Sequence, residues 1–511
     1  MGRPDNQLWE RLFSVRGSDP RPLQSQIRVA VVDAILGGVL PAGSAAPSSR
    51  ELAKSLKVSR NTVILAYQQL VDDGYLVSRE RSGFSVAADP PASLVQPQSK
   101  PAPPAITVPY QPAQWDQRFR VRSSTFRSIA KPSDWQSYPY PFLYGQFDPD
   151  LFPIADWRQC CRQALSIMEL KDWAPDKIDE DDPLLVEQLR SRILPRRGIW
   201  AQPDEIMITL GAQQALYLLA DLLFHRNSVV GIEDPGYPDM RNIAALRCDH
   251  VPLLPVDAEG LIPGRDMAVC DYVYVTPSHQ CPTTVTMPID RRFELLAEGT
   301  RRGTVFIEDD YESETRLTTP PLPALKSLDT DGRVIYVGSL SKVLAPGLRL
   351  GFIVASPDLI REARALRRLM VRHPPFNNQR TTALFLSLGH YEALVGRLAQ
   401  VFSERSRVLR EALARHLPQF RVSDGSGGSS LWLEGPRGFN AQAAADRARA
   451  QGLLIEPGNV FFGRPDHGRP CFRLGYSSVP VERIEPGIAL LARCVEEQLM
   501  AAGSSDQGNW T

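Results

Sequence analysis

The sequence has no long hydrophobic run and no regular cysteine spacing. No apolar stretch approaches the roughly 20 residues that a membrane-spanning helix needs, and four charged side chains within the first twelve residues argue against a signal peptide. The seven cysteines are scattered, with only Cys160 and Cys161 adjacent, and they suggest neither a metal site nor a disulfide framework. We therefore expect a reduced, cytoplasmic protein without metal or membrane contacts.

Charge of one sign is also not in excess, because 58 basic residues balance 58 acidic ones. Contact with nucleic acid would therefore depend on a local patch. A chain of 511 residues exceeds one ordinary core, so at least two domains are expected. Eight of the 44 prolines lie within residues 90–112, a composition typical of an extended linker. We predict an N-terminal domain over 1–87, a linker over 88–137, a C-terminal domain over 138–500 and a disordered tail over 501–511.

The pattern of the first domain predicts three helices and a β-hairpin. Apolar residues recur at helical spacing over 23–35, a short helix is expected over 49–56, and Ser59 is suited to cap a third helix. The apolar period then changes to two over 75–77 and 84–86, on either side of a polar turn that contains Gly83. A small α+β domain is the expected result.

The strings PSSRELA (47–53), VSRNTV (58–63) and AYQQL (66–70), with the wing glycine, resemble the winged helix-turn-helix of the GntR superfamily over 21–87. That fold places the start of its recognition helix in the major groove of double-stranded operator DNA. The expected DNA contacts are Ser48, Arg50, Ser59, Arg60, Asn61, Thr62, Arg79 or Arg81, and Gly83. Arg60 is the candidate for a guanine contact, and Ser59 and Thr62 suit phosphates. The alternative is a helical adaptor with solvated charges, since residues 1–88 hold eleven basic against eight acidic residues.

After the linker, short β-branched runs alternate with helical segments. The runs are 206–209, 229–232, 272–275, 305–307 and 334–337. This alternation predicts an α/β domain with a mainly parallel sheet, whose ligands bind beyond the carboxyl ends of the strands. Gly211, Tyr237, Asp309 and Lys342 each follow a predicted strand.

The residues after the last two runs predict a pyridoxal 5′-phosphate site. In the string SLSK (339–342) the serines can bind phosphate while the lysine reaches the aldehyde carbon. Arg349 can cap the phosphate, Asp309 can hold the pyridine nitrogen protonated, and Tyr311 can donate to the ring hydroxyl oxygen. Such a short string alone more often marks a solvated lysine, but four such residues in order on strand ends favour the cofactor.

The strings GAQQAL (211–216), EDPGYP (233–238), TPSHQCPT (276–283), EDDYESE (308–314) and SLSKVLAPGLRLG (339–351) resemble the fold-type-I, aspartate-aminotransferase-like domain over about 140–498. More narrowly, they resemble the MocR-type regulators, a GntR subgroup. The resemblance implies that Lys342 forms the Schiff base with pyridoxal phosphate and that Tyr237 stacks on its ring. It assigns the ring nitrogen to Asp309, the ring hydroxyl oxygen to Tyr311, the phosphate to Gly211, Ala212, Gln213, Ser339, Ser341 and Arg349, and an effector carboxylate to Arg473. Asp239 lies where some members carry a second ligand-binding arginine, which favours an effector with an extra amino group.

These features predict a homodimeric, cofactor-dependent transcription regulator. An amino-acid or amine effector would be sensed through external aldimine formation, and the controlled genes would serve catabolism or transport. One alternative is an active aminotransferase with a DNA anchor, because every group needed for transamination is present; residual activity is compatible with a regulator. A scaffold that no longer holds cofactor is contradicted by the Lys342 set. The fusion itself favours regulation, since a metabolic enzyme gains nothing from a helix-turn-helix.

Overall fold

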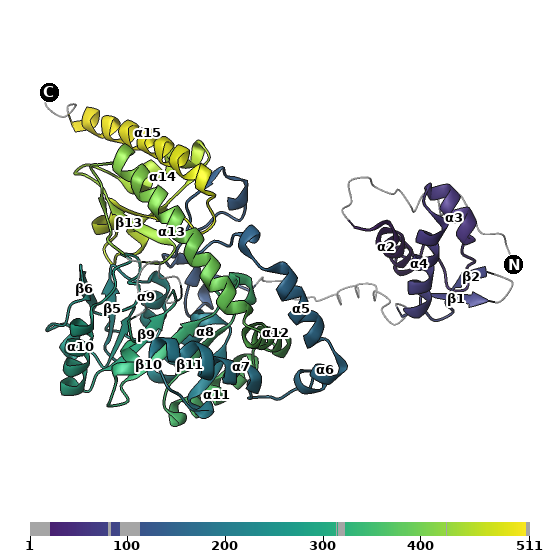
Figure 1. The fold of residues 1–511 in the computed structure, drawn as a ribbon, viewed down its shortest axis with the longest axis horizontal. Helices are drawn as coiled ribbons and strands as arrows, with labels where there is room; N and C mark the ends of the chain where they lie inside the picture. The colour runs from purple at the N-terminus through teal and green to yellow at the C-terminus, as the bar shows by residue number, and fades with distance from the viewer. Residues whose placement is uncertain are drawn as a thin grey trace, which may run out of the picture. The chain divides into compact units, whose positions relative to one another are not determined.

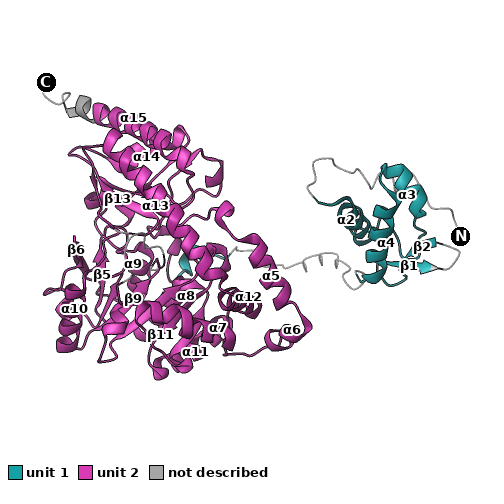
Figure 2. Cartoon of the chain, in the orientation of Figure 1, with its two compact units in different colours: residues 1–119 teal, residues 120–511 magenta. Residues whose placement is uncertain are grey.

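The computed structural model describes residues 21–79, 83–91, 113–312, 314, 322–425 and 427–506. The chain divides into two compact units, residues 1–119 and 120–511 (Figures 1 and 2). Among the described residues, no helix has the length and apolar character needed to cross a membrane.

The N-terminal unit has the predicted three helices and hairpin. They are α2 (Leu23–Leu36), α3 (Ser49–Leu56), α4 (Arg60–Asp72), β1 (Leu76–Arg79) and β2 (Gly83–Val86), with the two strands antiparallel. The core between the helices includes Val31, Val63 and Tyr67, all fully buried. The Tyr67 hydroxyl donates to the carbonyl of Pro47 at 3.1 Å, and its ring meets Phe84 edge-on at 4.9 Å. The hairpin is therefore fixed against the recognition helix by the same side chain that fills the core.

The C-terminal unit is built on an eight-stranded mixed sheet in the order β4-β11-β10-β9-β8-β5-β6-β7. The strands are β4 (Ile206–Thr209), β5 (Val230–Asp234), β6 (Leu253–Asp257), β7 (Gly260–Leu261), β8 (Tyr272–Val275), β9 (Val305–Asp310), β10 (Val334–Ser339) and β11 (Gly351–Val354). Strands β6, β5, β8, β9 and β10 are parallel, whereas β11 is antiparallel to both β10 and β4. The predicted α/β class and mainly parallel sheet are confirmed.

Successive residues along a strand pack into hydrophobic cores on opposite faces of this sheet, because side chains alternate between the two faces. Met207 and Ile335 pack with helices α8 (Gly211–Leu223), α9 (Pro238–Ala245) and α11 (Pro357–Val371). Ile208 and Tyr336 pack on the other face with α7 (Pro183–Gln188), α12 (Phe376–Ser387) and α13 (His390–His416). Helix α10 (Ile289–Arg302) covers a third cluster that includes Leu254 and Phe306. The sheet is thus buried on both faces, and its carboxyl edge is where functional side chains are accessible.

A smaller antiparallel sheet, in the order β12-β13-β16-β15, completes this unit. Its strands are β12 (Arg421–Val422), β13 (Ser430–Glu434), β15 (Glu456–Pro457) and β16 (Cys471–Gly475), and its helices are α14 (Ala441–Ala450) and α15 (Val481–Asp506). The first strand of this unit is β3 (Tyr140–Pro141), which pairs with β14 (Leu453–Leu454). Helices α5 (Ile154–Ala164) and α6 (Ile167–Trp173) follow it in the chain. Arg473 and Glu456 face each other in register across β16 and β15.

Two boundaries differ from the sequence prediction. Residues 127–131, expected to be linker, contact the C-terminal unit: Arg127 donates to the carbonyls of Phe462 and Gly463 at 3.2 and 2.8 Å. Helix α15 continues to Asp506, inside the predicted disordered tail. Within the predicted linker and tail, residues 92–112 and 507–511 lie outside the described residues.

Candidate functional site

A cavity of about 270 Å³ lies at the carboxyl edge of the large sheet. It collects every residue that the sequence assigned to cofactor or effector: Gly211, Ala212, Gln213, Tyr237, Asp309, Tyr311, Ser339, Ser341, Lys342, Arg349 and Arg473. Positions up to 262 residues apart in sequence are therefore neighbours in space. Asp239, noted in the sequence for its unusual charge, lines the same cavity.

Lys342 follows β10 and projects into this cavity, with its Nζ 4.4 Å from the centre of the Tyr144 ring. Gly145 makes this approach possible, because a Cβ there would lie 2.6 Å from Nζ and because its φ of +64° disfavours other residues. The loss of bulk water around the amine lowers the pKa of Lys342, an effect that nearby Glu312 opposes. A lysine with a lowered pKa is a better nucleophile at neutral pH.

Asp309, the second-last residue of β9, has one carboxylate oxygen with a hydrogen-bond partner and the other without one. Its Oδ2 accepts a hydrogen bond from the Tyr274 hydroxyl at 2.8 Å, whereas Oδ1 is buried with no hydrogen bond. Burial raises the pKa of Asp309 to about 7, against the opposing effect of Tyr274. A buried acceptor without a donor is costly, and a protonated pyridine nitrogen supplies the missing donor. The residues present therefore fit pyridoxal phosphate at this end of the cavity.

The start of α8 and the turn before β11, to which the sequence assigned the phosphate, lie next to each other at the cavity. Gly211 opens α8 with a φ of +76°, and Gly351 lies so close that a Cβ on it would be 2.7 Å from the Gly211 carbonyl carbon. Arg349, in the left-handed region at φ +52°, donates from Nη2 to the Leu210 carbonyl at 3.1 Å and stays exposed. Free backbone N–H groups of a helix start beside a guanidinium suit a dianion. Ser341 instead bonds the backbone of Leu350 through its hydroxyl.

Tyr237 and Tyr311 bring aromatic rings to the cavity, as predicted. The Tyr237 hydroxyl donates to Gln213 Oε1 at 2.7 Å and lies 3.3 Å from Asp239 Oδ2. Partial burial raises the pKa of Asp239. Tyr311 meets the ring of Tyr144 edge-on at 6.3 Å.

Arg473 lies in the cavity as predicted, but one edge of its guanidinium is already occupied. Its Nε donates to Glu456 Oε2 at 2.8 Å, and Nη2 lies 2.8 Å from the same oxygen. Both side chains are only 2–3% exposed, and the guanidinium stacks between the rings of Tyr144 and Phe461 at 4.1 and 4.7 Å. An effector acid would therefore meet an arginine whose charge is largely balanced.

The sequence reading missed Lys131, Tyr144, Tyr274 and Glu456. Lys131 and the two tyrosines line the cavity, and Glu456 holds Arg473. None belongs to a motif, and their positions depend on pairing between distant segments. The only sequence signal is the glycine at 145 within an aromatic run.

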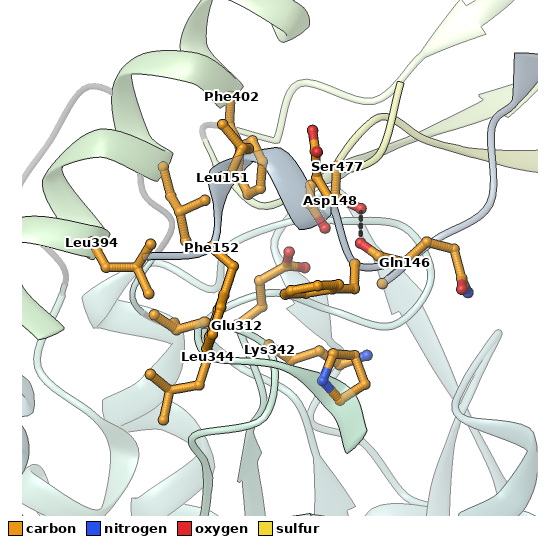
Figure 3. A pocket seen from close by; sticks show the side chains of 16 residues that line it. Gln146, Asp148, Leu151, Phe152, Glu312, Lys342, Leu344, Leu394, Phe402 and Ser477 are labelled. Carbon is orange, nitrogen blue, oxygen red and sulfur yellow. Dashed lines mark hydrogen bonds between the residues drawn. The ribbon is translucent and has the colours of Figure 1, made fainter. Parts of the chain in front are cut away.

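A second pocket adjoins Lys342 on the side of α13 (Figure 3). Apolar side chains of Leu151, Phe152, Leu394 and Phe402 line it, with Glu312 beside the lysine. At about 40 Å³ it has room for no more than a few water molecules. Of these two neighbouring cavities, the larger one has the room for a ligand.

The predicted DNA contacts lie at the starts of α3 and α4. Arg50, Ser59, Arg60 and Asn61 are exposed, and Arg60 Nε donates to Ser49 Oγ at 3.3 Å. Ser48 and Ser59 cap the two helices by accepting from Glu51 N and Thr62 N. The Ser59 and Thr62 hydroxyls share one hydrogen bond of 2.7 Å, which leaves one hydroxyl hydrogen for a phosphate oxygen. Gly83 begins β2, while the side chains of Arg79 and Arg81 lie outside the described part of the chain.

Comparisons with known families match both units. The family of bacterial regulatory proteins of the gntR type matches residues 23–86, and aminotransferases of class I and II match residues 182–489. The chain is 44% identical to the HTH-type transcriptional regulator TauR of Rhodobacter capsulatus, over 93% of this chain and 96% of that one. It is 28% identical to the probable rhizopine catabolism regulatory protein MocR of Rhizobium meliloti, over 91% and 92%.

Among solved structures, the C-terminal unit is similar to aminotransferases. LysN, an α-aminoadipate aminotransferase of Thermus thermophilus complexed with N-(5′-phosphopyridoxyl)-L-leucine, superposes with a TM-score of 0.67. The two are 27% identical, and the match covers 76% of this chain and 99% of LysN. The part of the chain without a counterpart in LysN includes the helix-turn-helix.

Proposed function

This chain belongs to the MocR-type transcriptional regulators of the GntR superfamily, and we propose that it binds operator DNA in response to an amino acid or amine sensed at a pyridoxal-phosphate site. The genes it controls would be those of catabolism or transport of that compound. The main observation in support is that all eleven residues assigned to cofactor or effector line one cavity. The same chain has a recognition helix, α4, whose first residues are exposed.

The cavity residues divide by chemistry. Pyridoxal phosphate supplies an aldehyde carbon that amines attack and a ring that withdraws electrons. Lys342 would hold that carbon, and Asp309 would keep the pyridine nitrogen protonated through its unpartnered Oδ1. Arg349 and the start of α8 would bind the phosphate, Tyr237 would support the ring, and Tyr311 would donate to the ring hydroxyl oxygen. Arg473 would orient an effector acid.

We also propose a homodimer. Leu165, Ile167 and Met168, around the start of α6, are 66–82% exposed, and Ile154 on α5 is 57% exposed. Exposed apolar side chains next to one another, such as Leu165, Ile167 and Met168, are candidates for an interface. Paired subunits would present two recognition helices to a repeated half-site. Sedimentation equilibrium should give twice the chain mass of 56.8 kDa.

The decisive experiment replaces the lysine. Lys342→Ala should abolish the visible absorption of the purified protein and the cofactor mass fixed to the chain by borohydride. Lys326→Ala is the matched control, because Lys326 pairs with Asp329 at 3.5 Å and does not line the cavity. Peptide mass spectrometry locates the modification, and a reducible linkage that persisted in Lys342→Ala would refute the assignment.

Turnover separates the regulator from the aminotransferase alternative. The same protein is mixed with amines and 2-oxoacids, and conversion of the 2-oxoacid into the corresponding amino acid is followed. A spectral change that stops at one equivalent, with altered DNA binding, supports the regulator. Many turnovers per site would favour the enzyme instead.

A further inference from the structure

At one end of the cavity, two basic side chains and one acidic side chain from outside the cofactor motifs lie around Tyr144, near which Lys342 and Glu312 also lie. Arg473 comes from β16, Glu456 from β15, and Lys131 from the segment that leads into the C-terminal unit. Lys131 and Arg473 both line the cavity that Lys342 enters. Arg473 and Lys131 both pair with the one carboxylate of Glu456, so basic side chains outnumber acidic ones in this set by one.

Arg473 alone does not account for this excess. Its Nε and Nη2 lie 2.8 Å from Glu456 Oε2, and both side chains are almost fully buried. A buried guanidinium beside its own carboxylate is electrically balanced. A ligand acid placed there would meet repulsion from Glu456 as well as attraction from Arg473. A further cation is needed for net attraction.

Lys131 supplies it. Its ammonium donates to the carbonyl of Tyr144, lies 3.6 Å from Glu456 Oε1, and its side chain is 29% exposed. Glu456 Oε1 also accepts from Tyr144 N at 3.2 Å. Lys131 thus lies beside Oε1 of the Glu456 carboxylate, whereas Arg473 lies beside Oε2. Part of the Lys131 side chain remains exposed and lines the cavity.

The backbone around Lys131 is fixed to the C-terminal unit. Arg127 donates to the carbonyls of Phe462 and Gly463, and Asn242 donates to the carbonyl of Arg127 at 2.9 Å. Ile129 packs against the apolar cluster that contains Phe461. A side chain presented from an anchored backbone loses less entropy on binding than one on a free loop.

We propose that Lys131 is a specificity-determining residue, and that with Arg473 it receives the single acid group, carboxylate or sulfonate, of an effector whose amine points to Lys342. This inference rests on the proposed function and deepens it by excluding amines without an acid group as preferred ligands. Arg473 offers a planar donor and Lys131 a mobile point charge, so both tetrahedral and planar acids can be bound.

The test compares amines with and without an acid group. Holoprotein variants Lys131→Met and Lys131→Arg are titrated with 3-aminopropanoate, 2-aminoethanesulfonate and n-propylamine, followed by the cofactor absorption. Lys131→Met should bind the better of the two acids about tenfold more weakly or worse, the loss of one charge-assisted contact, while n-propylamine is unchanged. Lys131→Arg should restore most of the affinity. Lys177→Met is the matched control, since Lys177 is 26% exposed, lies 3.9 Å from Glu180 and does not line the cavity.

Each other outcome has a distinct meaning. If Lys131→Met binds the acids as tightly as the wild type, or loses n-propylamine equally, the inference is overturned while the proposed function stands. If Arg127→Gln, which loosens the segment without removing the ammonium, gives the same selective loss and Lys131→Arg does not rescue, Lys131 acts by packing and the inference fails. A wild-type holoprotein that responds to no amine at all would refute the proposed function, and this inference with it.

Discussion

Because Arg473 pairs with Glu456, a substitution of the arginine should change the stability of the protein as well as the binding of an effector. Removing one partner of a buried ion pair leaves an uncompensated charge, which typically costs about 3–5 kcal/mol. Arg473→Ala should therefore lower the free energy of unfolding by about that amount, in addition to weakening the binding of an acid-bearing effector. Urea denaturation measures the first effect, and absorbance titration measures the second.

A double variant separates the two effects. Arg473→Met/Glu456→Gln removes the buried carboxylate together with the buried guanidinium, and Lys131, which is 29% exposed, keeps the Tyr144 carbonyl as its acceptor. Most of the stability should therefore return, while acid-bearing amines still bind more weakly than to the wild type. Recovery of effector binding along with stability would show that Arg473 is not the acid anchor.

Lys131 predicts a pH dependence. Burial, with smaller contributions from nearby Lys342 and Arg473, lowers the pKa of Lys131 to about 8 against the opposing effect of Glu456. The Lys131 side chain is a charged ammonium below this pKa and a neutral amine above it. The preference for 3-aminopropanoate over n-propylamine should hence be full near pH 7 and begin to decline as the pH rises through about 8. Both amines titrate in the range of a lysine side chain, so their ratio isolates Lys131, and the ratio should be flat for Lys131→Met.

At this scale the sequence revealed the residues whose roles are local. Lys342 and Asp309 could be assigned because each follows a strand inside a short motif. Glu456 could not, because it acts on Arg473 and on Tyr144, 312 residues away, only after the small sheet has formed. Tyr274 resembles any other strand residue until its hydroxyl reaches Asp309.

Among the elements, those with strong capping or periodicity were predicted well. Helices α3 and α4 begin one residue after Ser48 and Ser59, whose side chains accept N–H groups, as was expected for Ser59. Strand β11 was not predicted, since its four residues follow directly on a motif and have no period of their own. Its place between β4 and β10 depends on Gly351, whose missing side chain permits contact with Gly211. Residues 127–131 were assigned to the linker because anchoring by Arg127 leaves no mark in composition.

The recognition helix carries the prediction that belongs to this scale. Arg60→Ala should weaken specific operator binding by about 1–3 kcal/mol, the value of a bidentate base contact, with cofactor content unchanged. Gln68→Ala is the control, because Gln68 is exposed on α4 but two turns from its start. Binding is measured by fluorescence anisotropy on a duplex selected from a random library. An Arg60→Ala protein with wild-type affinity and footprint would show that another element reads the bases.

For the whole molecule, chain order suggests how the proposed sensing at the cavity would reach the DNA-binding unit. The segment that bears Lys131 is the first part of the C-terminal unit after residues 92–112. A ligand that contacts Lys131 therefore acts on the covalent connection to the helix-turn-helix. A ligand alters DNA binding only through its differential affinity for the two states of the protein.

Coupling of this kind is reciprocal, and the reciprocity gives the last prediction. If saturating 3-aminopropanoate or 2-aminoethanesulfonate changes operator affinity by some factor, saturating operator must change the affinity for that ligand by the same factor, typically about 5–150-fold. Operator affinity is measured by anisotropy with and without ligand, and ligand affinity by cofactor absorption with and without operator. Lys342→Ala should bind operator with no response to the ligand, because its helix-turn-helix is intact and its sensor is not. A wild-type protein whose operator affinity stays constant while its absorption shows full occupancy would refute effector control, because the cavity and the DNA-binding unit would then be energetically independent.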